Sequence, residues 1–290
     1  LKAPGIKSGI RAPAAAAGHR LRKEIFAPDK ITLVTGFRDG DVILCTVPLT
    51  HGFGFSTCFL EPLLVGAQVV ILERFGIETA LDAIQSYGVT LFPAVPTMLY
   101  RLLHQAPKGV GTLDTVVAGG AILSPDLEAS AREKLGVRIV NSYGITETCT
   151  WVSTSHRDGA RPPASVGRPL DVVTVRIVDR ERRVVGPGEL GEIVVGGPTV
   201  MHGYYKRPQE SAEVIDELGF HTGDVGRLDE DGYLYVVDRW KDMIICGGYN
   251  VYPKEVEDCL ALHPVVDEVA VVGVPDDEFG EIPKAFVVLR

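Results

Sequence analysis

The residues of this sequence best suited to chemistry lie in the stretch Tyr143-Gly144-Ile145-Thr146-Glu147, which follows an apolar, strand-like run. Gly144 lets the backbone come close to a ligand, because glycine has no Cβ. Thr146 offers a hydroxyl to a phosphate, and Glu147 offers a hard carboxylate oxygen to magnesium. The alternative is an ordinary strand-to-loop turn, and the stretch alone does not decide between the two.

A second candidate is the run His221-Thr222-Gly223-Asp224, which precedes a predicted hairpin. The carboxylate of Asp224 can accept both hydroxyls of a ribose, as acidic residues do in dinucleotide-binding folds. An Asx-type turn that leads into a strand is the alternative, and the run viewed alone favours that alternative.

Three further stretches have a functional and an ordinary interpretation. Asp238-Arg239-Trp240-Lys241 lies where the sequence changes in texture, and a charged residue there serves either as a hinge or as part of a solvated linker. Gly247-Gly248-Tyr249-Asn250 is either a loop that lines a narrow channel or a hairpin turn. His51, in the run PLTHG, either lies in a pocket or is an ordinary histidine at the start of a helix.

The elements that must position these residues alternate between strand and helix in the first half of the chain, which favours an α/β domain. In order, we expect a strand at 41–46, a mostly apolar helix at 54–65, a strand at 68–72, an amphipathic helix at 77–87, and a strand broken by prolines at 89–96.

The clearest unit runs from 114 to 147. Its strand at 114–118 is followed by a helix that Ser124 caps, that Pro125 opens and that Gly136 ends, and then by a strand at 137–141. Two strands joined in this way run parallel, so their carboxyl ends meet at one edge of the sheet, where open α/β sheets bind ligands. That edge receives residues 119–121 and 142–147.

The pattern of residue types changes after residue 166. Short β-branched runs there alternate with Gly/Pro turns and predict an antiparallel sheet or small barrel. We expect a large domain at 1–238, with 166–238 as its β-rich subdomain, and the start of a small C-terminal domain at 239–290. A helix at 253–262 and two strands belong to that second domain. The first 30 residues read as a frayed or incomplete domain start, with a transit peptide as the alternative, and the last strand reads as cut short.

Together and in this order, the motifs resemble the acyl-adenylate-forming superfamily, which includes acyl- and aryl-CoA ligases, adenylation domains of peptide synthetases, and luciferases. The resemblance covers roughly residues 40–290. The matching stretches are PLTHGFGF (48–55), NSYGITE (141–147), SVGRPL (165–170), GELGEIVVGG (188–197), MHGYYKRP (201–208), FHTGDVGRLDEDGYLYVVDR (220–239) and KDMIICGGYNVYPKEVE (241–257).

The resemblance implies a large adenylating domain with α/β layers and a small antiparallel β subdomain, followed by a truncated α+β C-terminal domain. It implies that Tyr143 stacks on adenine, with Gly119-Gly120-Ala121 along the same pocket. Thr146 would contact the phosphate, Glu147 would hold magnesium, and His51 would lie beside the acyl pocket.

In the second half of the chain, the resemblance implies that Asp224 binds the ribose hydroxyls and that Arg239 assists there. Lys241 would be the hinge about which the small domain rotates between two half-reactions. Gly247 and Gly248 would face the channel for the pantetheine arm of coenzyme A.

The implied reaction begins with attack of a carboxylate on the α-phosphorus of ATP, which gives acyl-AMP and pyrophosphate, and ends when the thiol of CoA displaces AMP. Such catalysis relies on positioning and on charge stabilisation, with magnesium central. The stretches 52–65 and 247–257 look most like fatty-acyl-CoA ligases. The alternatives are an adenylation domain that loads a carrier-protein thiol and a non-catalytic nucleotide-binding remnant.

Two departures from the family pattern stand out. A Ser/Thr/Gly-rich loop that cradles the ATP phosphates is represented at most by a remnant at Ala3–Gly9, and the family's lysine near the carboxyl terminus has no counterpart. We therefore expect the chain as given to be catalytically incomplete.

Composition agrees with an ordinary folded protein, with 46% hydrophobic and 23% charged residues. The net charge of −9 disfavours general nucleic-acid binding. The five cysteines show no metal-binding spacing and read as reduced thiols in a cytoplasmic protein, and no apolar run is long enough to cross a membrane. The sequence does not reveal an oligomeric state.

Overall fold

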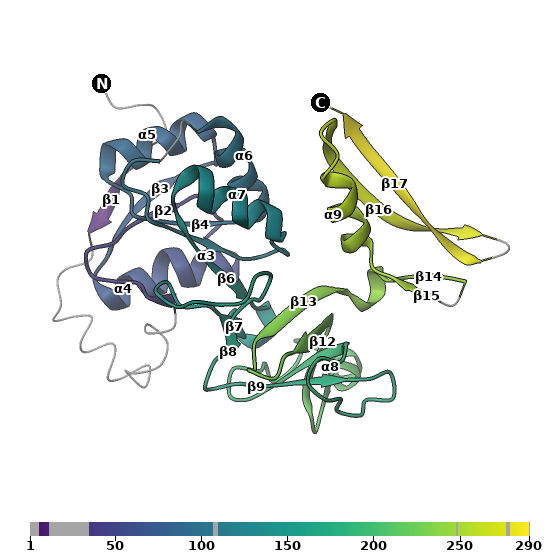
Figure 1. Ribbon diagram of the computed structural model, residues 1–290. Coiled ribbons are helices and arrows are strands. Elements are labelled where there is room, and N and C mark those ends of the chain that lie inside the picture. The colour runs from purple at the N-terminus through teal and green to yellow at the C-terminus, as the bar shows by residue number, and fades with distance from the viewer. Residues whose placement is uncertain (1–5, 12–34, 107–109, 248, 277–278, 290) are drawn as a thin grey trace. The chain divides into compact units, whose positions relative to one another are not determined.

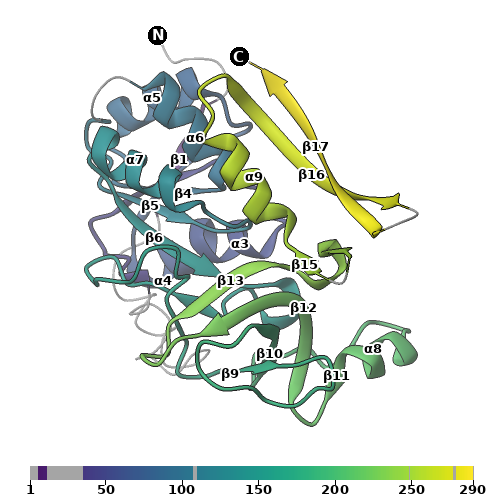
Figure 2. The same cartoon turned by 45° about the vertical axis from the view of Figure 1, so that its right-hand side comes forward.

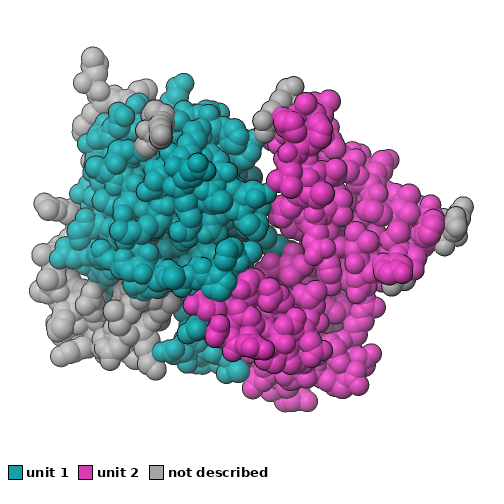
Figure 3. Space-filling model, in the orientation of Figure 1, with its two compact units in different colours: residues 1–174, 197–202 teal, residues 175–196, 203–290 magenta. Residues whose placement is uncertain are grey.

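The computed structural model describes residues 6–11, 35–106, 110–247, 249–276 and 279–289, with the backbone alone at 6–11. Two compact units divide the chain (Figure 3). Unit 1 comprises residues 1–174 and 197–202, and unit 2 comprises residues 175–196 and 203–290.

Unit 1 is built on a mixed sheet, in which the described residues form eight strands in the order β1-β3-β2-β4-β5-β6-β7-β8 (Figure 1). The five central strands run parallel, and β1, β7 and β8 run antiparallel to their neighbours. The bounds are β1 Ile6–Arg11, β2 Val42–Cys45, β3 Gln68–Leu72, β4 Leu91–Ala94, β5 Thr115–Ala118, β6 Arg138–Tyr143, β7 Ser153–Thr154 and β8 Arg168–Pro169.

The expected remnant of a phosphate loop at Ala3–Gly9 falls partly outside the described residues. Its remaining part, from residue 6, belongs to β1, which pairs with β3 in a register that aligns Ile6 with Leu72. β8 lies within the range 166–238 that we expected to be one antiparallel subdomain, but it belongs to the sheet of unit 1.

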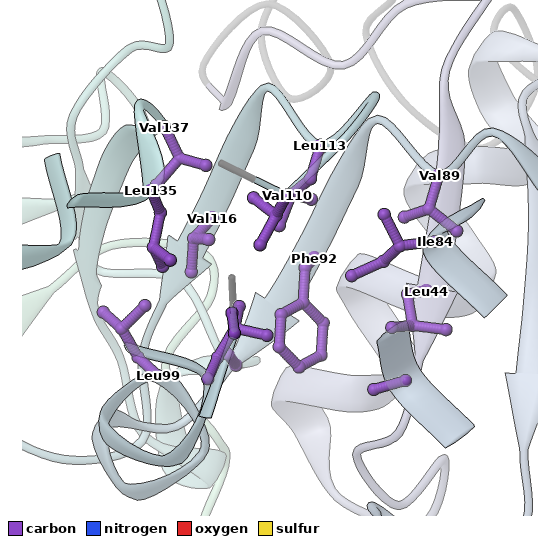
Figure 4. Packing of buried hydrophobic residues seen from close by; sticks show 14 of the residues in the cluster. Leu44, Ile84, Val89, Phe92, Leu99, Val110, Leu113, Val116, Leu135 and Val137 are labelled. Carbon is purple, nitrogen blue, oxygen red and sulfur yellow. The ribbon is translucent and has the colours of Figure 1, made fainter. Parts of the chain in front are cut away.

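Three helices pack on the sheet of unit 1 and close its main core. They are α5 Ile77–Tyr87, α6 Pro96–Gln105 and α7 Pro125–Leu135. Figure 4 shows Phe92 of β4 with Ile84 of α5, Leu99 of α6 and Leu135 of α7 in one apolar cluster, and each of these side chains is buried. Burial of a large apolar side chain contributes about 1.5–3 kcal/mol, so this cluster holds the parallel strands in place.

The ends of these helices follow local sequence signals. Ser124 accepts a hydrogen bond from the backbone N–H of Leu127 at 3.3 Å, Pro125 occupies the first turn, and Gly136 ends α7 in the left-handed region with φ +70°. The predicted helix and the parallel pairing of β5 with β6 are therefore confirmed. The run 89–96, predicted as a broken strand, is instead strand β4 followed at Pro96 by the first turn of α6.

The predicted helix at 54–65 begins earlier and is not regular. It consists of α3 Gly52–Phe55, a π-helical turn η1 at Ser56–Leu60, and α4 Glu61–Val65. The N–H of Glu61 donates to the carbonyl of Ser56, five residues before it, which is the signature of a π turn. Such a turn shifts the faces of the helix on which the following side chains lie, and it decides where Glu61 points.

Unit 2 contains an antiparallel sheet in which β12 pairs with β10, β11 and β13. The predicted antiparallel texture is confirmed for these strands. The bounds are β9 Thr174–Val178, β10 Gly191–Gly196, α8 Pro208–Val214, β11 Ile215–Asp216, β12 Gly219–Leu228 and β13 Leu234–Arg239.

The remainder of unit 2 forms a smaller sheet of β14 to β17. Helix α9 packs along strand β16 of this sheet (Figure 2). The backbone N–H of Val271 in β16 donates to Glu257 of α9 at 2.9 Å. The bounds are η3 Trp240–Asp242, β14 Ile244–Cys246, β15 Tyr249–Val251, α9 Pro253–Ala261, β16 Val266–Asp276 and β17 Gly280–Leu289. Unit 2 thus contains both sides of the boundary expected near 238–242, and that boundary stays a prediction.

Candidate functional site

In unit 1, the candidate residues other than His51 lie at the carboxyl ends of β5 and β6. The register pairs Ala118 with Asn141, so the segments that follow the two strands leave the sheet at the same edge. The hydroxyl of Ser142 donates to the carbonyl of Ala118 at 2.8 Å, which ties the two strand ends together. The chain therefore brings Gly119-Gly120-Ala121 beside the segment that begins at Tyr143.

Glycine is required at the two positions after β5 for different structural reasons. A Cβ on Gly119 would lie 2.9 Å from the ring of Phe53 and 3.0 Å from the hydroxyl of Ser142, so only glycine fits there without a shift. Gly120 adopts φ +80°, a left-handed conformation that favours glycine. Gly120 and Ala121 are exposed, whereas Gly119 is buried.

The loop after β6 folds back on itself directly after Tyr143. A Cβ on Gly144 would overlap the carbonyl oxygen of Thr150, and the N–H of Thr150 donates to the carbonyl of Ile145 at 3.0 Å. The N–H of Val152 then donates to the carbonyl of Tyr143 at 3.0 Å, which starts the antiparallel pairing with β7. Gly144 is thus required by the chain itself, a reason different from the close approach of a ligand that we expected.

Thr146 and Glu147 lie in a short 3₁₀ turn, η2 Thr146–Thr148. Thr146 is exposed and Glu147 is half-buried, and the carbonyl of Glu147 accepts a hydrogen bond from the N–H of Met201 at 2.8 Å. The turn ends in two non-glycine residues with positive φ, Cys149 at 55° and Thr150 at 82°. Backbone strain of this kind costs of order 1–3 kcal/mol per residue and gathers at functional sites.

The segment that carries His51 packs against the same loop. His51 is the N-cap of α3, and its Nδ1 accepts a hydrogen bond from the N–H of Phe53 at 3.2 Å. A Cβ on Gly52 would overlap the hydroxyl of Thr150, and the ring of Phe53 meets that of Trp151 edge-on at 6.2 Å. The structure gives His51 a capping role, and its place beside an acyl pocket stays a prediction.

Glu61, a buried acid of α4, is not among the residues predicted from the sequence to lie in the site. Its carboxylate is buried, and it accepts hydrogen bonds from the hydroxyl of Thr35 at 2.6 Å and from the indole N–H of Trp151 at 3.1 Å. Burial raises the pKa of Glu61 to about 7, against the opposing effect of these two hydrogen bonds. The signal available in the sequence was a single acid within the otherwise apolar run 52–65.

In unit 2, the triplet Thr222-Gly223-Asp224 forms a bulge within β12. The register pairs Val194 with His221 and Glu192 with Val225, so the single residue Ile193 of β10 faces all three. The hydroxyl of Thr222 donates to the carbonyl of Ile193 at 2.7 Å and accepts from the N–H of Asp224 at 3.1 Å. The triplet is therefore not a turn that leads into a strand, and bulges of this kind commonly re-aim a side chain near a functional site.

The bulge directs Asp224 toward Arg239. The two residues are paired across β12 and β13, and Nε of Arg239 donates to Oδ1 of Asp224 at 3.1 Å. The two residues that the resemblance assigns to the ribose are thus in contact, and their roles in binding ribose stay predictions.

Lys241 and Gly247 lie further along the chain. Lys241 is exposed in the 3₁₀ turn η3 between β13 and β14, beside Trp240, over whose ring the guanidinium of Arg180 lies at 5.5 Å. Gly247 adopts φ +56°, and its N–H donates to the carbonyl of Phe279 at 2.9 Å. Gly248 lies outside the described residues.

The predicted residues that the structure describes therefore divide into two groups, one in each unit. The group in unit 1 comprises His51, Gly119, Gly120, Ala121, Tyr143, Thr146 and Glu147, and the group in unit 2 comprises Asp224, Arg239, Lys241 and Gly247. Across the described ranges, no three His, Cys, Asp or Glu side chains come together as a metal site. Glu147 nevertheless fits magnesium, since this ion is commonly held by one or two carboxylates together with substrate phosphates.

Two family models match the chain, and both describe AMP-binding enzymes. The family model described as AMP-binding enzyme matches residues 23–205, and that described as AMP-binding enzyme C-terminal domain matches residues 255–290. The chain belongs to the family of AMP-binding enzymes.

Relatives within this family act on different acids, according to their names. The chain is 35% identical over 252 residues to a long-chain-fatty-acid–CoA ligase of Bacillus subtilis, a match that covers 86% of this chain and 45% of the relative. It is 40% identical over 263 residues to a feruloyl-CoA synthase of Amycolatopsis, which covers 89% of this chain and 53% of the relative. The chain thus spans about half the length of these curated relatives.

A solved structure of the same family is also similar. The o-succinylbenzoate coenzyme A synthetase of Bacillus subtilis, in complex with ATP and magnesium, superposes with a TM-score of 0.78 at 37% identity. The match covers 88% of this chain and 53% of that one. Within the described part of this chain, every helix is too short or too polar to cross a membrane.

Proposed function

We propose that this chain is part of an AMP-forming acid–thiol ligase, an acyl-CoA synthetase. In the whole protein, the carboxylate of an acid attacks the α-phosphorus of ATP, the bond to pyrophosphate breaks, and acyl-AMP forms. The thiolate of coenzyme A then attacks the acyl carbon and AMP leaves. The names of the relatives support this class of reaction, because all of those described above are CoA ligases or synthases.

The observation that carries the proposal is the shared sheet edge at the ends of β5 and β6. Ligands of open α/β sheets bind at the carboxyl ends of the strands, and here that edge presents Gly119-Gly120-Ala121 beside Tyr143. In the proposal, adenine stacks on the ring of Tyr143, with Gly119-Gly120-Ala121 along the same pocket. Thr146, exposed in the following turn, donates its hydroxyl to a phosphate oxygen.

In unit 2, the proposal assigns the ribose to Asp224, whose carboxylate accepts the two hydroxyls while Arg239 orients it. Lys241 serves as the hinge between a large domain at 1–238 and a small domain at 239–290. Gly247 and Gly248 line the channel for the thiol arm of coenzyme A. These roles require no protein nucleophile, so catalysis consists of positioning and charge stabilisation.

Magnesium would be held by Glu147 together with phosphate oxygens, and it would neutralise the charge that develops on the polyphosphate. The chain's own contribution is to hold the backbone at Glu147. The N–H of Met201 donates to the carbonyl of Glu147 in the turn η2, and the N–H of Thr150 donates to the carbonyl of Ile145, directly before that turn.

For the acid, we propose a fatty acid, as the apolar run 52–65 suggests, with CoA as the acceptor. Relatives named for feruloyl and succinylbenzoate substrates make aromatic acids the necessary comparison. We also propose a cytoplasmic setting, on the ground that all five cysteines are free thiols.

Calorimetry of AMP binding to this chain tests the proposed class of AMP-forming ligase. Tyr143→Ala is the variant, and Tyr87→Ala, on α5, is the control. We expect Tyr143→Ala to weaken AMP binding about tenfold, the order of one lost stacking contact, and the control to bind as the parent does. Thioester formation by the whole protein, with hexadecanoate, octanoate, ferulate and benzoate as acids, tests the substrate. Failure of the folded chain to bind AMP, or of the whole protein to acylate CoA, would overturn the proposal.

A further inference from the structure

Two hydrogen bonds to residues of β10 hold the bulge that carries Asp224. On one side, the hydroxyl of Thr222 bonds to Ile193. On the other side, the N–H of Gly223 donates to Oε1 of Glu192 at 3.0 Å. Gly223 adopts φ +71°, so its N–H points out of the strand ladder and needs an acceptor from a side chain.

Glu192 is itself fixed by a buried histidine. Its second oxygen, Oε2, lies 2.9 Å from Nδ1 of His221, and only 4% of the His221 side chain is exposed. The other ring nitrogen, Nε2, lies 2.8 Å from Oδ2 of Asp216 in β11. The ring therefore joins β10, β11 and β12 through one side chain.

Asp216, the third member of the cluster with Glu192 and His221, is also held by hydrogen bonds of its own. Its Oδ1 accepts from the N–H of Leu218 at 2.9 Å, and its Oδ2 accepts from Arg182 at 3.0 Å. Burial opposes ionisation, yet the bonds from Leu218, His221 and Arg182 hold the pKa of Asp216 below its usual range. The carboxylate is therefore charged and ready to hold the ring.

We propose that His221 is a positioning residue for ribose recognition, acting through Glu192 and the N–H of Gly223 on Asp224. This inference rests on the proposed function, since it needs Asp224 to bind the ribose hydroxyls. A free glutamate has several rotamers, but Glu192 is held in one by its contacts with the ring of His221 and the N–H of Gly223. Loss of the bond at Nδ1 releases Glu192, leaves the Gly223 N–H without its acceptor, and lets the bulge and Asp224 move.

Two variants of His221 separate its two bonds. The amide nitrogen of asparagine corresponds in position to Nδ1 of histidine, so His221→Asn keeps the bond to Glu192 and loses that to Asp216. The amide nitrogen of glutamine corresponds to Nε2, so His221→Gln keeps the bond to Asp216 and loses that to Glu192. The proposal requires that the second variant is the damaging one.

The experiment compares the affinity of the chain for AMP with its affinity for 2′,3′-dideoxy-AMP, which lacks both ribose hydroxyls. We expect His221→Gln to weaken AMP binding about tenfold, the order of one charge-assisted hydrogen bond, and to leave dideoxy-AMP binding nearly unchanged. His221→Asn should keep most of the preference for AMP. His263→Gln, an exposed histidine of unit 2, is the control and should change neither affinity.

The outcomes distinguish this inference from the proposed function. Equal weakening of both ligands by His221→Gln, or equal effects of the two His221 variants, means that His221 is only structural and overturns the inference. A parent chain that binds AMP no better than dideoxy-AMP removes Asp224 from the ribose site and overturns that part of the proposed function as well. Should His221→Gln not fold, Glu192→Asp, which shortens the side chain and keeps its charge, must give the same selective loss.

Discussion

Nε of Arg239 lies 3.1 Å from Oδ1 of Asp224, and the two residues face each other across β12 and β13. The pair joins a carboxylate that is 7% exposed to a guanidinium that is 57% exposed. A charge-assisted bond fixes the direction of the carboxylate, while the exposed cation adds positive potential at the surface. The pair is therefore suited to hold a polar, hydroxyl-bearing ligand.

The first prediction concerns Asp224. Asp224→Ala should weaken AMP binding at least about tenfold, because each hydrogen bond from a ribose hydroxyl to a carboxylate contributes roughly 1.5–3 kcal/mol. Isothermal calorimetry on the folded chain measures the effect, and Asp231→Ala, at the exposed tip of the same hairpin, is the control. Unchanged affinity in a folded Asp224 variant would exclude this carboxylate from the site.

The second prediction concerns the hinge role of Lys241 in the whole protein. Lys241→Pro fixes φ near −65° and should hinder rotation about the turn η3. Its effect should therefore fall unequally on adenylation, measured as pyrophosphate exchange, and on thioester formation, measured from a preformed acyl-AMP. Lys241→Ala, which leaves φ free, separates the loss of the side chain from the loss of backbone freedom. Equal effects of the proline on both half-reactions would contradict the hinge.

The third prediction concerns the buried carboxyl of Glu61. Its pKa in the folded chain is about 7, above the value of 4.5 for a free glutamate, so folding favours the protonated form. The stability that this group contributes is fully present below pH 4.5 and is lost as the pH rises through 7. The loss amounts to roughly 3 kcal/mol.

Urea unfolding of the parent and of Glu61→Gln at pH 5 and pH 8 measures this dependence. The amide keeps a similar shape but does not titrate, so the variant should lose much less stability between the two pH values. Glu133→Gln, on the exposed face of α7, should retain the pH dependence of the parent. If the parent and Glu61→Gln lose the same free energy of unfolding between pH 5 and pH 8, Glu61 does not titrate in this range.

The fourth prediction concerns Gly144. A methyl group there overlaps the carbonyl oxygen of Thr150, so Gly144→Ala should destabilise the chain by about 2 kcal/mol or more, or displace the loop 145–150 and abolish AMP binding. Gly40→Ala is the control, since nothing lies within 4 Å of its Cβ position and its φ is not positive. A stable Gly144→Ala variant with full AMP affinity would rule out the contact as described.

Local signals in the sequence determined much of the scaffold. Ser124, Pro125 and Gly136 set the ends of α7 because each acts on its own neighbours in the chain, by capping, by a fixed φ, or by tolerance of the left-handed region. The parallel pairing of β5 with β6 followed from the strand–helix–strand order, because such crossovers place the two strands in one direction. The ordered set of motifs also determined the family.

Only the tertiary structure decided what the remaining residues contact. The sequence shows only a single acid at 61 within an apolar run, whereas in the structure a π turn directs it to Trp151, 90 positions away, and to Thr35. Glu192 and His221 are 29 positions apart, and only the register of β10 with β12 brings them together beneath the bulge. Contacts between residues distant in the chain depend on strand register and on helix phase, and both are fixed only when the apolar faces of the elements pack in the core.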